Sequence, residues 1–192
     1  SAEIRGLNIG NITISAYSSI ATHWLPSVIK NFQEAYPRIH IRMMEGIRQE
    51  NIKWLEEKVV DLAFCSYEEP MEYDWIPLAE DPMVAVLPAD HPLAHSPSYP
   101  LANQYEKFIM PALGQDDDVT ALFRRHHLSP QIAFTTLENF AATALIEQGM
   151  GMSIMNSLIT QRWQFHVAKL PLSPPQSITL GIALPSLRQA SP

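Results

Sequence analysis

The strongest constraint on the fold is the alternation of strand-like and helix-like segments in the first third of the chain. Isoleucines alternate with polar residues over residues 11–15, and apolar residues then recur at helical spacing over 20–36. A strand pattern at 40–44, a short helix pattern at 51–58 and a buried-strand run at 61–65 follow. Strands that alternate with helices predict a parallel sheet, and such sheets bind ligands beyond the carboxyl ends of their strands.

Hydroxyl side chains stand at two of these strand ends. One loop contains Tyr17, Ser18 and Ser19, and the other contains Ser66 and Tyr67. Ser18 or Ser19 is suited to cap the helix that follows the first strand. We therefore expect these residues at a ligand-binding edge, with helix capping as the alternative role for the two serines.

The second half of the chain predicts a further α/β unit. Helices are expected at 119–125, after the acidic cluster Asp116–Asp118, and at 138–148, where Gly149 gives a C-terminal stop signal. Further strand patterns and a helical turn surround them: strands 75–78, 83–88, 107–110, 131–135, 152–155, 166–170 and 178–183, and the turn 158–162. Two such units suggest two lobes between which the chain crosses and returns.

Composition narrows the possible partners. The chain has 192 residues, 13 lysines and arginines, 20 acidic residues and a formal net charge of −7. Because the basic residues are scattered and the chain is acidic, these residues are not expected to bind nucleic acid directly. The single cysteine, Cys65, excludes a disulfide within the chain. No apolar run reaches the length of about 20 residues that a membrane span requires, and no export signal is visible.

An ordered series of short motifs resembles the effector-binding domain of LysR-type transcriptional regulators, and this resemblance covers nearly the whole chain. The most distinctive piece is the loop Leu-Pro-Ala-Asp-His-Pro-Leu-Ala at 87–94. The other matching pieces, in order, are 14–21, 24–26, 32–37, 45–46, 60–64, 77–81, 147–154 and 170–172.

The resemblance implies an α/β fold of the periplasmic-binding-protein-like type 2, with two Rossmann-like lobes joined by two crossover strands. Lobe I is expected at 1–82 and 166–192, and lobe II at 83–165. A small, anionic effector is expected in the cleft between the lobes. Family effector contacts map onto the hydroxyl loops described above and onto Thr135 and Thr136: Tyr17, Ser18, Ser19, Ser66, Tyr67, Thr135 and Thr136. Hydroxyls and free helix N-terminal N–H groups suit such an anion.

The resemblance also implies partners. Family members carry an N-terminal winged helix-turn-helix, which is absent from this sequence, so DNA is expected to be bound only through that missing domain. Residues 1–10 resemble the tail of the linker, and the chain stops before a final helix found in the family. A homodimer through the first helix and strand 40–44, a tetramer of the full-length protein and a cytoplasmic location are expected. No membrane partner and no cofactor are expected.

Other functions have less support in the sequence. A periplasmic solute-binding protein of the same fold is the main alternative, and an enzyme on this fold is a third. Cys65 lies in an apolar strand, where cysteine is usually an inert small hydrophobe. The i, i+4 pair His91 and His95 is separated by Pro92, which does not support a helical metal site. No nucleophile, base and orienting group occur together, so the sequence predicts that the chain is not an enzyme.

Overall fold

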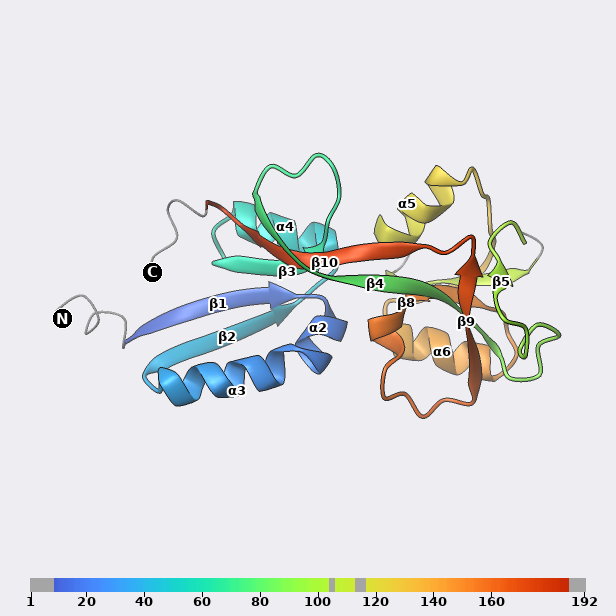
Figure 1. The fold of residues 1–192 in the computed structure, drawn as a ribbon, viewed down its shortest axis with the longest axis horizontal. Coiled ribbons are helices and arrows are strands. Elements are labelled where there is room, and N and C mark those ends of the chain that lie inside the picture. Colours follow the sequence, from blue (N-terminus) through green and yellow to red (C-terminus); the bar gives the residue numbers. More distant parts are fainter. Residues whose placement is uncertain (1–8, 104–105, 113–116, 187–192) are drawn as a thin grey trace. The chain divides into compact units, whose positions relative to one another are not determined.

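The computed structural model describes residues 9–103, 106–112 and 117–186, and the chain divides into two compact units (Figure 1). Unit 1 comprises residues 1–79 and 179–192, and unit 2 comprises 80–178. The long strands β4 (Asp74–Pro88) and β10 (Ser177–Leu184) each contain one of the two boundaries. The chain therefore passes between the units twice, each time within a strand.

The chain returns to unit 1 at residue 179, whereas the sequence analysis expected lobe I to resume at residue 166. Strand β9 (Val167–Ser173) pairs antiparallel with residues 84–88 of β4, which belong to unit 2. Because this pairing holds β9 within unit 2, the chain re-enters unit 1 only in β10. The expected linker tail at residues 1–10 lies almost entirely outside the described residues.

Unit 1 is organised around β1 (Gly10–Ala16), which pairs in parallel with β2 (Ile39–Glu45) on one side and β3 (Leu62–Ser66) on the other. Strand β10 is antiparallel to β3, so the sheet order is β2-β1-β3-β10. The parallel β-α-β-α-β arrangement predicted from the sequence is confirmed.

The first helical segment is divided, whereas its sequence pattern predicts one helix over 20–36. The structure has α2 (Ser18–His23) and α3 (Leu25–Ala35), with Trp24 between them. Pro26 is in the first turn of α3, where its missing N–H has no intrahelical partner to lose. The proline thus begins a new helix instead of interrupting an existing one.

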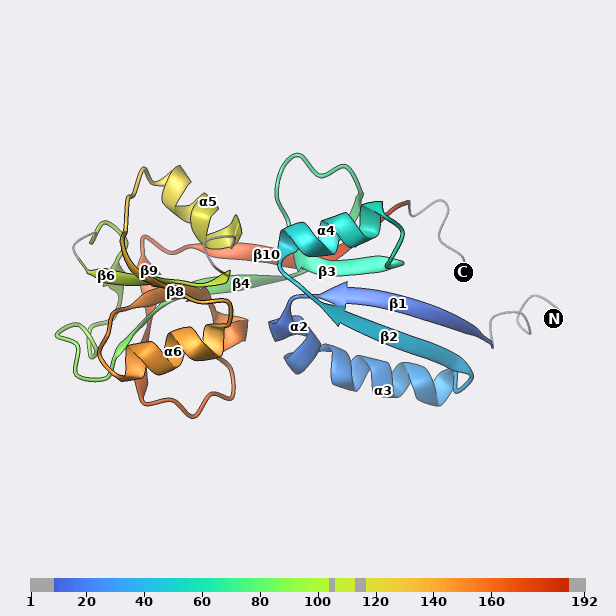
Figure 2. The same ribbon diagram turned by 180° about the vertical axis from the view of Figure 1, so that it is seen from behind.

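The core of unit 1 lies between β3, β10 and α4 (Arg48–Glu56). Leu55, Val60, Cys65 and Ala183 form a buried cluster. Cys65 is fully buried, as expected for a cysteine that behaves as a small hydrophobe. In both ribbon views α2 and α3 lie on one side of the β1–β3 sheet and α4 on the other (Figures 1 and 2).

The two extended segments expected at 75–78 and 83–88 form one continuous strand, β4, whose second part lies in unit 2. Strand β8 (Ser153–Asn156) and β9 pair with this part of β4 on its two sides, and β5 (Tyr99–Pro100) extends the sheet beyond β9. Asp81 on β4 is buried and accepts hydrogen bonds from Asn156 Nδ2 at 2.6 Å and from the Leu158 N–H at 3.1 Å. Burial raises the pKa of Asp81, and these hydrogen bonds partly oppose that rise.

A smaller parallel pair, β6 (Lys107–Met110) and β7 (Gln131–Thr135), completes the strands described in unit 2. The helical segments that the structure bounds in this unit are α5 (Asp117–Arg125), α6 (Asn139–Glu147) and the 3-10 turn η2 (Ser157–Thr160). The α5 helix begins at Asp117, inside the acidic cluster and two residues before the expected start at 119, and Asp116 lies outside the described residues. Gly149 adopts φ +75°, which confirms the stop signal after α6.

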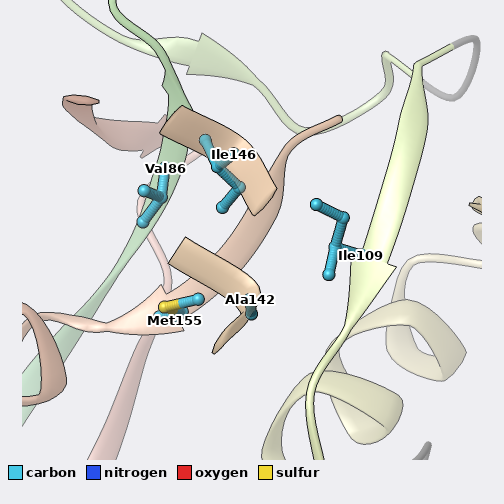
Figure 3. Close-up of a cluster of buried hydrophobic side chains, with 5 residues drawn as sticks. All are labelled: Val86, Ile109, Ala142, Ile146 and Met155. Atoms are coloured by element: carbon cyan, nitrogen blue, oxygen red, sulfur yellow. The ribbon is translucent and has the colours of Figure 1, made fainter. Parts of the chain in front are cut away.

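The core of unit 2 brings together side chains from β4, β6, α6 and β8. Figure 3 shows Ile109, Ala142 and Ile146 with Val86 and Met155, all of them buried. Helix α6 contributes Ala142 and Ile146, one turn apart, to this core, and it contacts β6, β8 and β9. In the parts of the chain that the structure describes, no helix is long and apolar enough to cross a membrane.

Gly181 offers a test of the packing in unit 1. A Cβ at this position would collide with the backbone carbonyl of Ile76 and would lie 2.6 Å from the Trp75 ring. We expect Gly181→Ala to lower the free energy of unfolding by about 1–3 kcal/mol, because a backbone atom cannot move aside as a flexible side chain can. Urea denaturation followed by circular dichroism measures this loss. Gly10→Ala is the control, because a Cβ there would meet nothing within 4 Å; an equal loss in both variants would contradict the explanation.

Candidate functional site

Three strand ends of unit 1 converge at one edge of its sheet. The Tyr17 N–H, just beyond β1, donates to the carbonyl of Phe64 in β3 at 3.1 Å. The Gly46 N–H, just beyond β2, donates to the carbonyl of Ala16 at 3.1 Å. Because parallel strands end at the same edge, the loops after β1, β2 and β3 are held side by side.

The structure brings Tyr17 and Ser66 together at this edge. The Tyr17 hydroxyl and Ser66 Oγ lie 2.8 Å apart, a hydrogen-bond distance at which either can donate. Ser66 is fully buried and Tyr17 is half-buried. The two predicted loops are therefore joined by their own side chains.

Ser18 and Ser19 occupy the first turn of α2, but neither is its cap. The N-cap residue is Tyr17, and no side chain caps this end of the helix. The capping role considered for the two serines is therefore wrong. Ser18 is exposed, whereas Ser19 is 7% exposed and its Oγ is buried without a hydrogen-bond partner among the described residues. A buried hydroxyl without a hydrogen bond costs free energy, so the Ser19 hydroxyl would gain by donating a hydrogen bond to a ligand.

Tyr67 lies directly beyond β3 and differs from Ser66 in its exposure. Its N–H donates to the Thr179 carbonyl at 2.9 Å, and its hydroxyl donates to Glu69 Oε1 at 3.3 Å. Its ring stacks in a tilted geometry against Trp75, with centroids 5.6 Å apart. Desolvation, followed by the effect of the Glu69 carboxylate, raises the pKa of the Tyr67 hydroxyl. The phenol therefore stays neutral and can donate at ordinary pH.

Arg48, which the sequence interpretation did not select, reaches the same edge. It is the first residue of α4, and its Nε donates to the Ser66 carbonyl at 3.4 Å. Its Nη2 donates to the Glu68 carbonyl at 3.5 Å, and its Nη1 forms an ion pair with the Glu68 carboxylate at 3.1 Å. The sequence predicted a turn at 45–46 and a helix from residue 51, which left Arg48 unassigned between them, so only the observed start of α4 reveals its position.

Thr135 and Thr136 lie in unit 2, at the end of β7. Thr135 is exposed, and Thr136 Oγ1 donates to the Glu138 carbonyl at 3.1 Å. The Thr136 N–H donates to the carbonyl of Met110 at the end of β6. Glu138 is the N-cap residue of α6, but no side chain caps that helix end. This strand-to-helix connection is the counterpart in unit 2 of the Tyr17 loop in unit 1.

The described ranges contain no candidate metal-binding cluster. No group of three or more His, Cys, Asp or Glu side chains within them could hold a metal ion. His91, considered above with His95, contacts Glu106 instead: Nε2 and Oε1 are 3.0 Å apart. The His91 Nδ1 accepts from the Leu93 N–H at 3.0 Å, so the ring stabilises the 87–94 loop.

The architecture matches a known class of domain. The model of the family described as the LysR substrate binding domain matches residues 5–192. A relative, the uncharacterized HTH-type transcriptional regulator YvbU of Bacillus subtilis (strain 168), is 29% identical over 191 residues, which cover 97% of this chain and 65% of the relative. The chain spans between 44% and 65% of the length of the first curated regulators that it matches.

Solved structures agree with this match. The effector binding domain of QuiR in complex with shikimate has a TM-score of 0.84 and 25% identity, over 96% of this chain and 91% of that chain. The Synechocystis PCC6803 CcmR regulatory domain in complex with 2-PG has a TM-score of 0.83 and 22% identity, over 95% of this chain and 90% of that chain, and shares the fold.

These observations define a ligand-binding α/β domain of the periplasmic-binding-protein-like type 2 fold. The chain belongs to the LysR substrate binding domain family. Both the fold class and the family expected from the sequence are confirmed.

The Tyr17–Ser66 contact gives a prediction for this site. We expect Tyr17→Phe to lower the free energy of unfolding by about 1 kcal/mol, because it leaves the buried Ser66 hydroxyl without this partner. Urea denaturation measures the difference. Tyr36→Phe is the control, because Tyr36 is exposed and its hydroxyl lies outside this contact, so it should change stability by less than about 0.5 kcal/mol. Equal stability of Tyr17→Phe and the unmodified chain would show that the contact contributes nothing.

Proposed function

We propose that this chain is the ligand-sensing part of a cytoplasmic transcriptional regulator. A small anionic effector binds in a cleft between the two lobes, and the resulting change is transmitted to a DNA-binding winged helix-turn-helix outside these residues. The observation that carries the proposal is the group of hydroxyl donors at the ends of β1 and β3, in a chain whose curated relatives are transcriptional regulators.

The chemistry of the site favours an anion. Ser18, Ser19 and Tyr67 supply neutral hydroxyl donors, and Arg48 supplies a guanidinium at the same edge. Thr135 and Thr136 would supply further donors from unit 2. The similar QuiR domain was solved with shikimate, whose carboxylate is the kind of group that such donors bind. Binding acts as a switch only if the effector favours one arrangement of the lobes over another.

The alternative of a periplasmic solute-binding protein has the same fold but less support. The curated relatives are regulators that contain a helix-turn-helix, and the match to YvbU extends over 97% of this chain. The net charge of −7 is unsuited to direct DNA binding, which fits a division of labour with a separate DNA-binding domain.

We further propose that the domain forms a homodimer through α3 and β2, within a tetramer of the full-length regulator. Strand β2 is at the edge of its sheet, and Val28 on α3 is 55% exposed. Met43 on β2 and Tyr36 beyond α3 are also exposed. In unit 2, Ile132 and Phe140 present apolar surface on β7 and α6, which a second copy could cover. Exposed apolar groups of this kind mark contact surfaces when they cluster.

A thermal-shift screen of small carboxylates, beginning with shikimate, tests the proposed effector site. At least one compound should raise the melting temperature, because a ligand that binds only the native state stabilises it. Ser19→Ala and Thr135→Ala should each lower the affinity for that compound by about tenfold or more, since each removes a hydrogen bond to a charged group. Thr22→Ala, at an exposed position of α2, is the matched control. Unchanged affinity in both site variants would refute the site assignment.

Analytical ultracentrifugation tests the dimer. We expect Val28→Asp to raise the dimer dissociation constant at least about tenfold, because it places a charge within an apolar interface. Val59→Asp introduces the same charge at another exposed apolar residue, beyond α4, and should leave the dissociation constant unchanged. A chain that stays monomeric at high micromolar concentration would contradict the proposed dimer.

A further inference from the structure

The Arg48–Glu68 ion pair combines a fixed cation with a carboxylate that is free to leave. The Arg48 side chain is 14% exposed, whereas that of Glu68 is 36% exposed. Two main-chain carbonyls, those of Ser66 and Glu68, hold the guanidinium from one side through Nε and Nη2. The Glu68 carboxylate is held by the remaining nitrogen, Nη1.

The energies of these contacts are unequal. Removing Glu68 from the pair would leave Arg48 with both carbonyl contacts, so the guanidinium would keep its position. The Glu68 side chain would lose one ion pair and would enter water, which costs little for a group already about one-third exposed. A largely buried guanidinium without its carboxylate would then need another anion. The arrangement therefore allows another anion to replace the Glu68 carboxylate while Arg48 stays in place.

The position of the pair connects it with the ligand edge. The Ser66 residue whose carbonyl binds Arg48 also contacts the Tyr17 hydroxyl through its side chain. Arg48 begins α4, and the N-terminal region of a helix also favours negative charge. A carboxylate or phosphate at this point would meet the charged guanidinium at Nη1, the nitrogen that pairs with the Glu68 carboxylate.

We propose that Glu68 is an internal counter-ion that occupies the anion position of Arg48 until an external carboxylate or phosphate displaces it. This inference rests on the proposed function and adds to it how the site selects its ligand. An anion gains the guanidinium that Glu68 releases, whereas a neutral analogue must leave the ion pair intact. Selection by ligand charge thus comes from a local exchange, in a chain whose net charge of −7 would repel anions at long range.

Titration with inorganic phosphate tests this exchange without knowledge of the natural effector. Binding is followed in the full chain by NMR, through the Arg48 Nε–H signal and the Tyr67 backbone amide, at a constant ionic strength of about 0.15 M. Glu68→Gln should bind phosphate about fivefold or more tightly than the unmodified chain, because it removes the internal competitor. Arg48→Gln should abolish saturable shifts at Tyr67.

The control is the other acid-base pair of this region. Lys53 on α4 and Glu57, the residue after this helix, have i, i+4 spacing; Lys53 Nζ and Glu57 Oε1 lie 3.9 Å apart, and both side chains are exposed. Glu57→Gln changes the net charge by the same amount as Glu68→Gln, but it should leave the phosphate affinity within about twofold. If the two variants tighten binding equally, the effect is one of overall charge and the proposal fails.

Two further results would overturn the proposal: phosphate affinity that is unchanged in Glu68→Gln, or phosphate binding that is retained in Arg48→Gln. If Arg48→Gln does not fold, Arg48→Lys replaces it. Lysine places its three donors on one nitrogen and cannot reproduce the spacing of the three guanidinium nitrogens, so this variant should also bind phosphate more weakly. The metabolite screen depends on Ser19 and Thr135 and not on Glu68, so failure of the exchange and failure of the proposed function are separate results.

Discussion

The parallel pairing of β1 with both β2 and β3 is the interaction on which the rest of the site depends. Because the three strands run in the same direction, their carboxyl ends meet at one edge. The loops that follow are then joined by main-chain bonds from Tyr17 and Gly46 and by the Tyr17–Ser66 side-chain contact. A single sheet arrangement thus brings together donors that are about fifty positions apart in the chain.

In the proposed site, local donors rather than overall charge would determine which ligand binds. The chain is acidic, so an anion approaching it meets an unfavourable field at long range, although salt screens much of that field. At short range, the Arg48 guanidinium and hydroxyls such as that of Ser19 outweigh this field. The Glu68 carboxylate forms an ion pair with Arg48, and we propose that an external anion displaces it. An acidic surface is therefore compatible with an anion site, provided that the cation is held in place and its partner can leave.

Local patterns predicted the elements well where one physical preference dominates. The isoleucine alternation of β1 and the glycine after α6 each led to the observed element. Predictions differed from the structure where pairing between distant residues determines how far a strand extends or which unit it joins. The β4 strand is continuous through Pro77 and has β10 as a neighbour in the sheet, and β9 stays in unit 2 because it pairs with residues 84–88 of β4. Arg48 was missed because its contacts are with Ser66 and Glu68, which no local pattern around residue 48 reveals.

By itself, the sequence determined the order of strands and helices, the family and the loops that carry hydroxyl groups, because hydrophobic periodicity and short motifs are local properties of the chain. Only the tertiary structure decided which side chains meet: Tyr17 with Ser66, Arg48 with Glu68, and Asp81 with Asn156. It also showed that the Ser19 Oγ is buried without a hydrogen-bond partner among the described residues, and that Ser19 is not a helix cap. The reason is physical, since hydrogen bonds and burial depend on the distances between atoms, and sheet pairing sets those distances between residues far apart in the chain.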